Sequence, residues 1–343
     1  MSCSSLLRCL LVLMASPWVV GCALTPPVAQ NLPPLTWPAE ANVPARVQFI
    51  KAFSTPDDLG FAKSFFQRVA DVIFGASDVR LVRPMAVIAV KDVVYVADPG
   101  AKCVQRFDTT TGRHDLIYRE GNTGLPSPVA LAKGNLGEVY LTDSELAQVF
   151  VIKPGASVAT PVKLPPMLQP TGVAMDASTG RLIVVDTASH VVNIFNPDGS
   201  LHTQFGKRGT GPGEFNYPTL IWHDSGGKLY VTDSLNFRVQ VFDSQGGYLS
   251  QFGRLGDSSG DNMRQKGVAT DSYGHVYIVD ALFNAVQIFN DQGHLLMSFG
   301  AMGSDRGEFW LPSGIFIGND DLIYVADSHN RRIQVFRYIG GPT

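Results

Sequence analysis

The chain has 343 residues, of which 27 are lysine or arginine and 30 are aspartate or glutamate, so its formal net charge is −3 at pH 7. Proteins that bind nucleic acids usually carry a basic patch, and this mildly acidic composition gives no electrostatic reason to expect one. Nucleic-acid binding is therefore excluded from the expected functions.

The N-terminus, residues 1–21, has the features of a secretory signal. Arg8 precedes the apolar stretch 9–20, which is too short to span a bilayer and suits the apolar core of a signal peptide. The segment ends in Val-Val-Gly-Cys, which resembles a bacterial lipobox, and the resemblance implies that Cys22 is lipidated. Ala23 follows, and by similarity to enterobacterial sorting this favours the outer membrane over the inner membrane. We expect a lipid-anchored protein of the bacterial cell envelope; the alternative is an ordinary secretory signal.

Residues 22–45 follow the signal and are rich in proline with few charges. This composition predicts an extended, semi-rigid tether that holds the folded domain away from a membrane. Once the signal is removed, Cys22 and Cys103 are the remaining cysteines, so no disulfide is expected if Cys22 carries lipid. We interpret Cys103 as a small buried residue rather than a reactive thiol.

Two elements are predicted between the tether and the repeats. Residues 46–53 read as a β-strand of the kind that ends each repeat described next. Residues 57–75 form an expected amphipathic helix, with apolar residues at helical spacing and a glycine at its end. Its apolar face is expected to pack on the domain. The alternative, a helix lying on lipid, is disfavoured by the low number of basic residues on its polar face.

A short phrase of apolar or small residues that ends in aspartate recurs six times within residues 84–336. The aspartates are separated by 45, 43, 47, 47 and 47 residues, and they are Asp98, Asp143, Asp186, Asp233, Asp280 and Asp327. An apolar residue, phenylalanine in five of the six copies, follows each aspartate after nine positions. In five copies a proline lies 14 to 16 residues ahead of the aspartate, where it would open a strand; the fifth copy lacks it.

A period of this length, built from short apolar strands separated by turns, is typical of propeller blades. The sequence therefore predicts an all-β fold, a six-bladed β-propeller of four-stranded antiparallel blades, forming one domain over residues 46–343. Only residues 337–343 follow Phe336, so the sixth blade lacks a last strand of its own. We expect residues 46–53 to supply that strand and close the ring, which removes an exposed sheet edge.

The repeats resemble a known family in detail. Residues 170–176 read Pro-Thr-Gly-Val-Ala-Met-Asp, and residues 236–242 and 330–336 read Asn-Phe-Arg-Val-Gln-Val-Phe and Asn-Arg-Arg-Ile-Gln-Val-Phe. These segments resemble the NHL repeat, and the resemblance covers residues 84–336. The first two copies depart from the pattern, with Cys103 and Gln148 where the motif has arginine. The resemblance implies the propeller fold, which hosts many unrelated functions.

Residues for chemistry do not converge in the sequence. The repeated aspartates are expected to accept hydrogen bonds from the turns that follow them, since a catalytic group has no reason to occur in every repeat. A propeller lyase similar to the peptide-amidating enzymes would gather three histidines on an axial zinc, but the seven histidines here fall at scattered repeat positions. The glycine-rich segment 206–213 leads into a strand rather than a helix, so we interpret it as a connecting loop. We predict no catalytic residue, no metal ligand and no cofactor.

A binding surface is the remaining expectation. In a four-stranded blade the loops between blades and those between second and third strands lie on one face, and we predict binding there. The candidate residues are basic or aromatic: Lys207, Arg208, Arg238, Arg254, Arg306, Trp310, Arg331 and Arg332. Charge scattered over loops can equally be ordinary solvated surface.

These observations favour a non-catalytic, lipid-anchored envelope propeller that binds a protein or glycan partner through one loop face, and that is a monomer. The alternative is an enzyme resembling propeller lyases or lactonases, with zinc or calcium in the axial channel.

Overall fold

The computed structural model describes residues 33–39, 42–61, 79–256, 260–261 and 263–341. Apart from Pro33, these residues fall within a unit that begins at Pro34. The predicted signal peptide, the lipidation of Cys22 and most of the tether lie outside the described residues and stay predictions. In the described ranges, no helix has the length and apolar character needed to cross a bilayer.

The described residues form β-strands with three short 3-10 helices, so the fold is all-β. The first half contains β1 (Thr36–Trp37), β2 (Val47–Phe53), η1 (Asp57–Leu59), β3 (Ala86–Val90), β4 (Val93–Asp98), β5 (Cys103–Asp108), β6 (Arg113–Arg119), η2 (Glu120–Asn122), β7 (Pro128–Lys133), β8 (Val139–Asp143), β9 (Gln148–Ile152), β10 (Val158–Pro161), β11 (Pro170–Asp176) and β12 (Arg181–Asp186). The second half contains β13 (Val191–Phe195), β14 (Leu201–Phe205), β15 (Pro218–His223), β16 (Leu229–Asp233), η3 (Ser234–Asn236), β17 (Arg238–Phe242), β18 (Tyr248–Phe252), β19 (Gln265–Thr270), β20 (Val276–Asp280), β21 (Ala285–Phe289), β22 (Leu295–Phe299), β23 (Ile315–Ile317), β24 (Leu322–Asp327) and β25 (Arg332–Tyr338).

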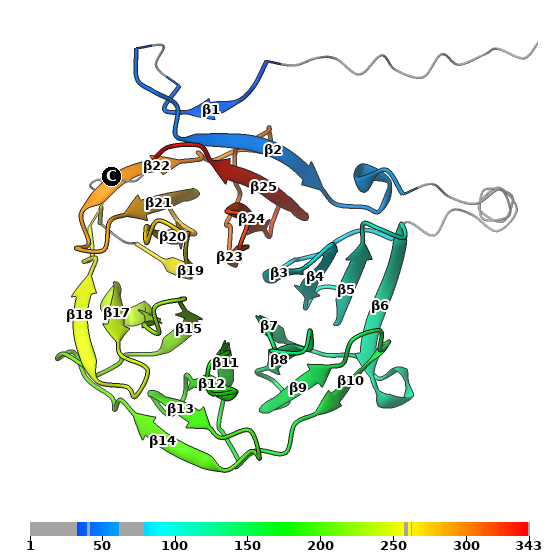
Figure 1. Ribbon diagram of the computed structural model, residues 1–343, viewed down its shortest axis with the longest axis vertical. Coiled ribbons are helices and arrows are strands. Elements are labelled where there is room, and N and C mark those ends of the chain that lie inside the picture. Colours follow the sequence, from blue (N-terminus) through cyan, green and yellow to red (C-terminus); the bar gives the residue numbers. More distant parts are fainter. Residues whose placement is uncertain (1–32, 40–41, 62–78, 257–259, 262, 342–343) are drawn as a thin grey trace, which may run out of the picture. The chain divides into compact units, whose positions relative to one another are not determined.

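The strands build antiparallel sheets that follow the repeats. Three repeats form separate four-stranded sheets, with the orders β11-β12-β13-β14, β15-β16-β17-β18 and β19-β20-β21-β22. The first two repeats share an eight-stranded sheet because β6 and β10 pair in parallel, with Val158 beside Tyr118. Within the unit the sheets surround a common axis, with the first strand of each repeat innermost and the later strands towards the rim (Figure 1).

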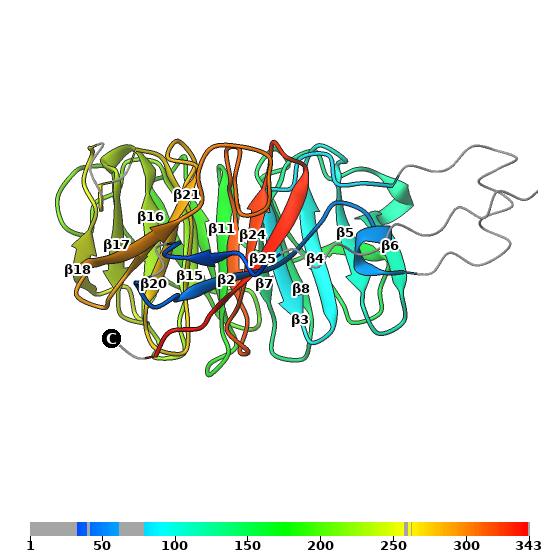
Figure 2. The same cartoon turned by 90° about the horizontal axis from the view of Figure 1, so that it is seen from above.

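The last repeat takes its outer strand from the other end of the chain. β2 pairs with β25 antiparallel, from Val47 beside Tyr338 to Phe53 beside Ile333, and the two strands lie side by side in both views (Figures 1 and 2). β1 pairs with the far side of β2. This short strand lies inside the predicted tether, and it joins the sheet because the Trp37 ring packs 5.8 Å from Phe336. The extended tether therefore ends before Thr36.

The repeated phenylalanines are core residues. Each lies on the third strand of its repeat and is at most 1% exposed, together with the isoleucine of the second copy: Phe107, Ile152, Phe195, Phe242, Phe289 and Phe336. Phe242 shows the packing, because its ring centroid lies 4.8 Å from Phe205 and 5.6 Å from Phe215. Aromatic contacts thus join the third strand of this repeat, β17, to the fourth strand of the preceding repeat, β14.

Only the beginning of the predicted helix 57–75 is described. η1 forms a single 3-10 turn in which the Asp58 carboxylate accepts hydrogen bonds from the amides of Ser54 and Thr55, at 2.7 and 2.9 Å. Gly60 ends the turn with a φ of 75°, a conformation that favours glycine. Residues 62–78 lie outside the described residues, so the helix stays a prediction.

Candidate functional site

The six repeat aspartates are internal anchors rather than reactive groups. All six end second strands and are at most 3% exposed. Asp98 accepts hydrogen bonds from the amide of Ala101 in the following turn, at 3.1 Å, as the sequence predicted. It also accepts from the amides of Val82 and Arg83, at 2.7 and 2.9 Å, and these residues precede the first strand of the same repeat. Each aspartate thus links the loop that precedes the first strand of its repeat to the turn that follows the second strand.

Arg238 was predicted as part of the binding face, and this prediction is wrong. Its side chain is buried, with 6% of the residue exposed. Its Nε donates to Asp233 Oδ2 at 2.8 Å, and its Nη2 donates to the carbonyls of Gly211 and Glu214. Nη1 donates to Gln251 Oε1. The guanidinium therefore fixes the incoming loop of its own repeat and is not free for a partner.

Arg332 repeats this arrangement and is corrected for the same reason. Its Nε donates to Asp327 at 2.8 Å, and its terminal nitrogens donate to the carbonyls of Ser304, Asp305 and Glu308. The sequence carries a signal for both residues: each arginine stands five positions after the repeat aspartate and two positions before a glutamine that bonds the same carboxylate.

Six predicted residues do lie exposed, and together they define the loop face: Lys207, Arg208, Arg254, Arg306, Trp310 and Arg331. Five lie on loops that follow fourth strands and one on the turn between β24 and β25, which are connections at the same end of the sheets. Figure 2 shows the loops gathered at the two ends of the strands. Lys207 is ion-paired with Glu214 at 3.2 Å, and Arg254 with Asp261 at 2.7 Å.

Three arginines of the loop face have no ion-pair partner in the part of the chain that the structure describes: Arg208, Arg306 and Arg331. Arg306 lies over the Phe49 ring, 5.9 Å from its centroid. Trp310 is 48% exposed and packs beside His329, with the ring centroids 5.5 Å apart. Arginine and tryptophan are among the side chains that most often anchor protein interfaces.

The glycine-rich segment 206–213 behaves as a connecting loop. The Glu214 carboxylate accepts hydrogen bonds from the amides of Thr210 and Gly211, at 3.1 and 2.9 Å. A carboxylate of the chain itself thus occupies the position in which a phosphate would be cradled.

A cavity of about 190 Å³ lies on the axis, where the first strands begin. Its lining comes from all six repeats: Met85, Val129, Gln169, Thr171, Thr187, Thr219, Leu220, Lys266 and Ser313. Six of these residues stand directly after the position of the opening proline, one in each repeat: Met85, Val129, Thr171, Thr219, Lys266 and Ser313. The first strands follow the inter-repeat loops, so the cavity lies at the same end of the sheets as the loop face.

Hydroxyl groups around this cavity join neighbouring repeats. Thr171 Oγ1 donates to the carbonyl of Thr219 at 2.7 Å, and Ser313 Oγ donates to the carbonyl of Met85 at 2.8 Å. Thr187 Oγ1 donates to the carbonyl of Pro218 at 2.6 Å. A hydroxyl has a single proton to donate, so these groups offer mainly their lone pairs to the cavity.

Lys266 is the cationic residue of this lining. Its ammonium group has no hydrogen-bond or ion-pair partner among the described residues. Burial, and secondarily the charge of Arg264, lowers the pKa of Lys266 below its ordinary value. Lys266 is not among the candidate residues of the predicted binding face, and it stands in the one repeat that lacks the opening proline.

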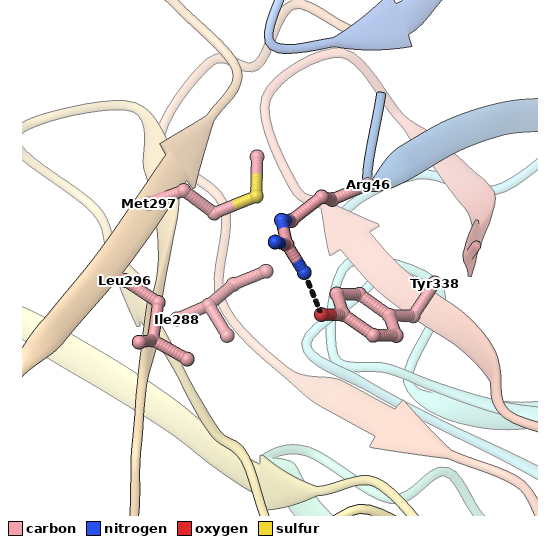
Figure 3. Close-up of a pocket in the computed structure, with 5 residues that line it drawn as sticks. All are labelled: Arg46, Ile288, Leu296, Met297 and Tyr338. Carbon is pink, nitrogen blue, oxygen red and sulfur yellow. Dashed lines mark hydrogen bonds between the residues drawn. The ribbon is translucent and has the colours of Figure 1, made fainter. Parts of the chain in front are cut away.

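A second cavity, of about 110 Å³, lies at the outer edge between β22 and the sheet that contains β25 (Figure 3). Arg46 points towards Tyr338 there, and its Nη1 donates to the tyrosine hydroxyl at 3.3 Å. Apolar side chains of Ile288, Leu296 and Met297 form the other wall. This smaller cavity involves few elements and its cation already has a partner, so the axial cavity is the better candidate site.

Cys103 is fully buried, and burial raises the pKa of its thiol to about 12, with a smaller contribution from the charge of Asp98. A thiol with this pKa is a poor nucleophile at neutral pH. Within the described ranges, no group of three or more histidine, cysteine, aspartate or glutamate side chains could hold a metal ion. The axial cavity offers a cation and hydroxyl groups, a set of donors that does not suit zinc or calcium.

Known proteins with this architecture bind or act on diverse molecules. An auxiliary nutrient binding protein from Bacteroides thetaiotaomicron superposes with a TM-score of 0.61 at 13% identity, covering 77% of this chain and 71% of that one. Virginiamycin B lyase from Staphylococcus aureus gives 0.54 at 15% identity, covering 75% and 96%. A chain of a nidogen/laminin complex gives 0.53 at 18% identity, covering 71% and 84%. Identities this low show the fold alone.

Sequence comparison identifies parts of the chain. No curated protein matches it. Residues 309–336 match the family model of the NHL repeat, and residues 173–227 match a model described as a 6-bladed β-propeller. The resemblance to NHL-repeat propellers that the sequence predicted is therefore confirmed.

Proposed function

We propose that this protein is a non-catalytic, lipid-anchored propeller of the bacterial envelope that binds a protein or glycan partner through its loop face. One observation carries the proposal. The repeat aspartates are buried and bonded internally, while Arg208, Arg306 and Arg331 stand exposed without an ion pair among the described residues. The face therefore presents three guanidinium groups without ion pairs and an exposed tryptophan, Trp310, which suits an acidic partner surface.

The proposed scaffold is a ring of six four-stranded blades, one for each repeat, with β2 completing the sixth. The pairing of β2 with β25 supports this closure. Binding as the general role is supported by the printed names of the nutrient binding protein and the nidogen/laminin complex. The enzymatic alternative draws on the similarity to virginiamycin B lyase, but the lining of the axial cavity does not suit a metal.

Crosslinking in the native envelope tests the loop face. We expect the chain to capture a specific partner, identified by mass spectrometry, and the triple variant Arg208→Glu, Arg306→Glu, Arg331→Glu to lose at least about tenfold of that capture, since reversing three interface charges weakens association strongly. A matched control reverses three exposed lysines that end first strands or follow them, at the other end of the sheets: Lys91, Lys133 and Lys228. Equal loss in both triple variants, or no loss in either, would contradict the proposed face.

Fractionation tests the anchor. We expect Cys22→Ser to move the protein from the membrane fraction into the soluble periplasm, because the thiol that would carry lipid is absent and one removed anchor abolishes stable attachment. The variant protein should still capture the partner of the loop face. Retention of Cys22→Ser in washed membranes would contradict lipid anchoring at this residue.

A further inference from the structure

The axial cavity is chemically two-sided. Met85, Val129 and Leu220 contribute apolar side chains, whereas Thr171, Thr219 and Ser313 contribute hydroxyls and Lys266 contributes an ammonium group. Figure 1 shows that β19 of the fifth repeat, which carries Lys266, lies across the axis from β7 of the second repeat, which carries Val129. The cavity therefore offers one positive charge together with apolar surface in the first two repeats.

The fifth repeat is built differently from the others at this point. Gln265 replaces the opening proline, is 1% exposed, and donates from Nε2 to the carbonyls of Asp233 and Arg238 at 3.4 and 3.1 Å. The carbonyl of Lys266 itself accepts a hydrogen bond from Thr232 Oγ1 at 3.0 Å. Contacts with the preceding repeat thus hold the Gln265 side chain and the Lys266 carbonyl, so the attachment point of the lysine at the cavity is fixed.

A half-buried lysine without a counter-charge is costly, because burial removes water from the ammonium group and nothing replaces it. The cavity lining contains no aspartate or glutamate. Arg264 also disfavours the charged lysine. A bound anion would supply the missing counter-charge.

We propose that the axial cavity binds a small carboxylate with a short apolar chain, whose carboxylate pairs with Lys266 and whose chain packs on Met85 and Val129. A single ammonium group with hydroxyls that already donate elsewhere matches one negative charge better than a phosphate dianion, which needs several donors. The volume of about 190 Å³ suits a molecule of a few carbon atoms. This site is separate from the loop face and does not depend on the partner proposed for it.

Nuclear magnetic resonance of the full chain, labelled with carbon-13 at the lysine Cε atoms, tests the site with propionate as probe. We expect propionate to shift the Lys266 signal saturably and to raise the pKa of this amine by about 1 unit, as an adjacent opposite charge does. Sodium chloride at equal ionic strength and uncharged n-propanol should leave the signal in place. Lys266→Arg identifies the signal by removing it while keeping the charge.

A matched pair of variants decides whether binding needs the lysine. Lys266→Met should abolish the propionate-dependent rise in thermal stability, whereas Lys228→Met, at an exposed lysine, should keep it. A response to chloride or propanol equal to that of propionate would overturn the proposal, as would an unchanged propionate response in Lys266→Met. If Lys266→Met does not fold, the titration of the unmodified chain alone decides, because a Lys266 signal that propionate does not shift overturns the proposal.

Discussion

Replacing Phe242 with alanine is expected to lower the free energy of unfolding by about 3 to 5 kcal/mol, the usual cost of deleting a buried aromatic ring. The ring is 1% exposed and contacts Phe205, Phe215 and Tyr248, with centroids 4.8, 5.6 and 6.0 Å away. The cavity left by alanine would separate β17 from β18 and from the preceding sheet. Unfolding in urea, followed by tryptophan fluorescence and circular dichroism, measures the change.

Tyr248 provides the control for this substitution. It contacts the same ring but is 38% exposed at the outer edge, so Tyr248→Ala should cost far less than Phe242→Ala. Equal losses in the two variants, or a loss below about 1 kcal/mol for Phe242→Ala, would show that the third-strand phenylalanines do not form the core.

Replacing Asp233 with alanine is expected to lower the free energy of unfolding by about 3 to 5 kcal/mol, because it leaves the buried guanidinium of Arg238 without its counter-charge. The carboxylate also accepts hydrogen bonds from the amide of Asn216 at 2.7 Å and from Gln240 Nε2 at 3.0 Å. The incoming loop would lose its attachment together with the ion pair. Urea unfolding measures the total loss, and hydrogen exchange at Asn216 locates it.

A double-mutant cycle separates the ion pair from the other contacts. Adding Arg238→Met to Asp233→Ala should restore part of the stability, since an apolar side chain of similar length removes the unpaired charge. The exposed pair of Lys207 and Glu214 is the matched control, and Lys207→Ala should change stability little. A double variant less stable than Asp233→Ala alone would contradict this account of Arg238.

The periodic features of the sequence predicted the strands well. The repeat aspartate ends a second strand in every copy, and the apolar residue nine positions later is buried, because strand spacing and turn length repeat with the motif. Arg238 and Arg332 were placed on a surface because loop arginines are usually exposed. Both guanidinium groups are instead bonded to the carboxylate five positions earlier and to carbonyls of the preceding inter-repeat loop. The contacts with the loop are not local in sequence, so the sequence pattern did not reveal them.

Two other residues escaped prediction for a similar reason. Trp37 lies in a proline-rich stretch that reads as a spacer, yet it packs on Phe299 and Phe336, which lie more than half the chain away. Lys266 occupies a position that differs from repeat to repeat. The role of that position in lining a cavity is visible only when the six copies come together at the axis. The sequence identifies elements through local periodicity, whereas both of these contacts depend on how the elements come together.

The pairing of β2 with β25 has a consequence for the order in which the chain is synthesised. A chain made from its N-terminus produces residues 47–53 long before residues 332–338. β2 therefore lacks its partner β25 while the repeats fold. Until β25 arrives, β2 exposes free amides and carbonyls that can pair with another chain. Shielding by a chaperone during synthesis would therefore matter most for residues 47–53.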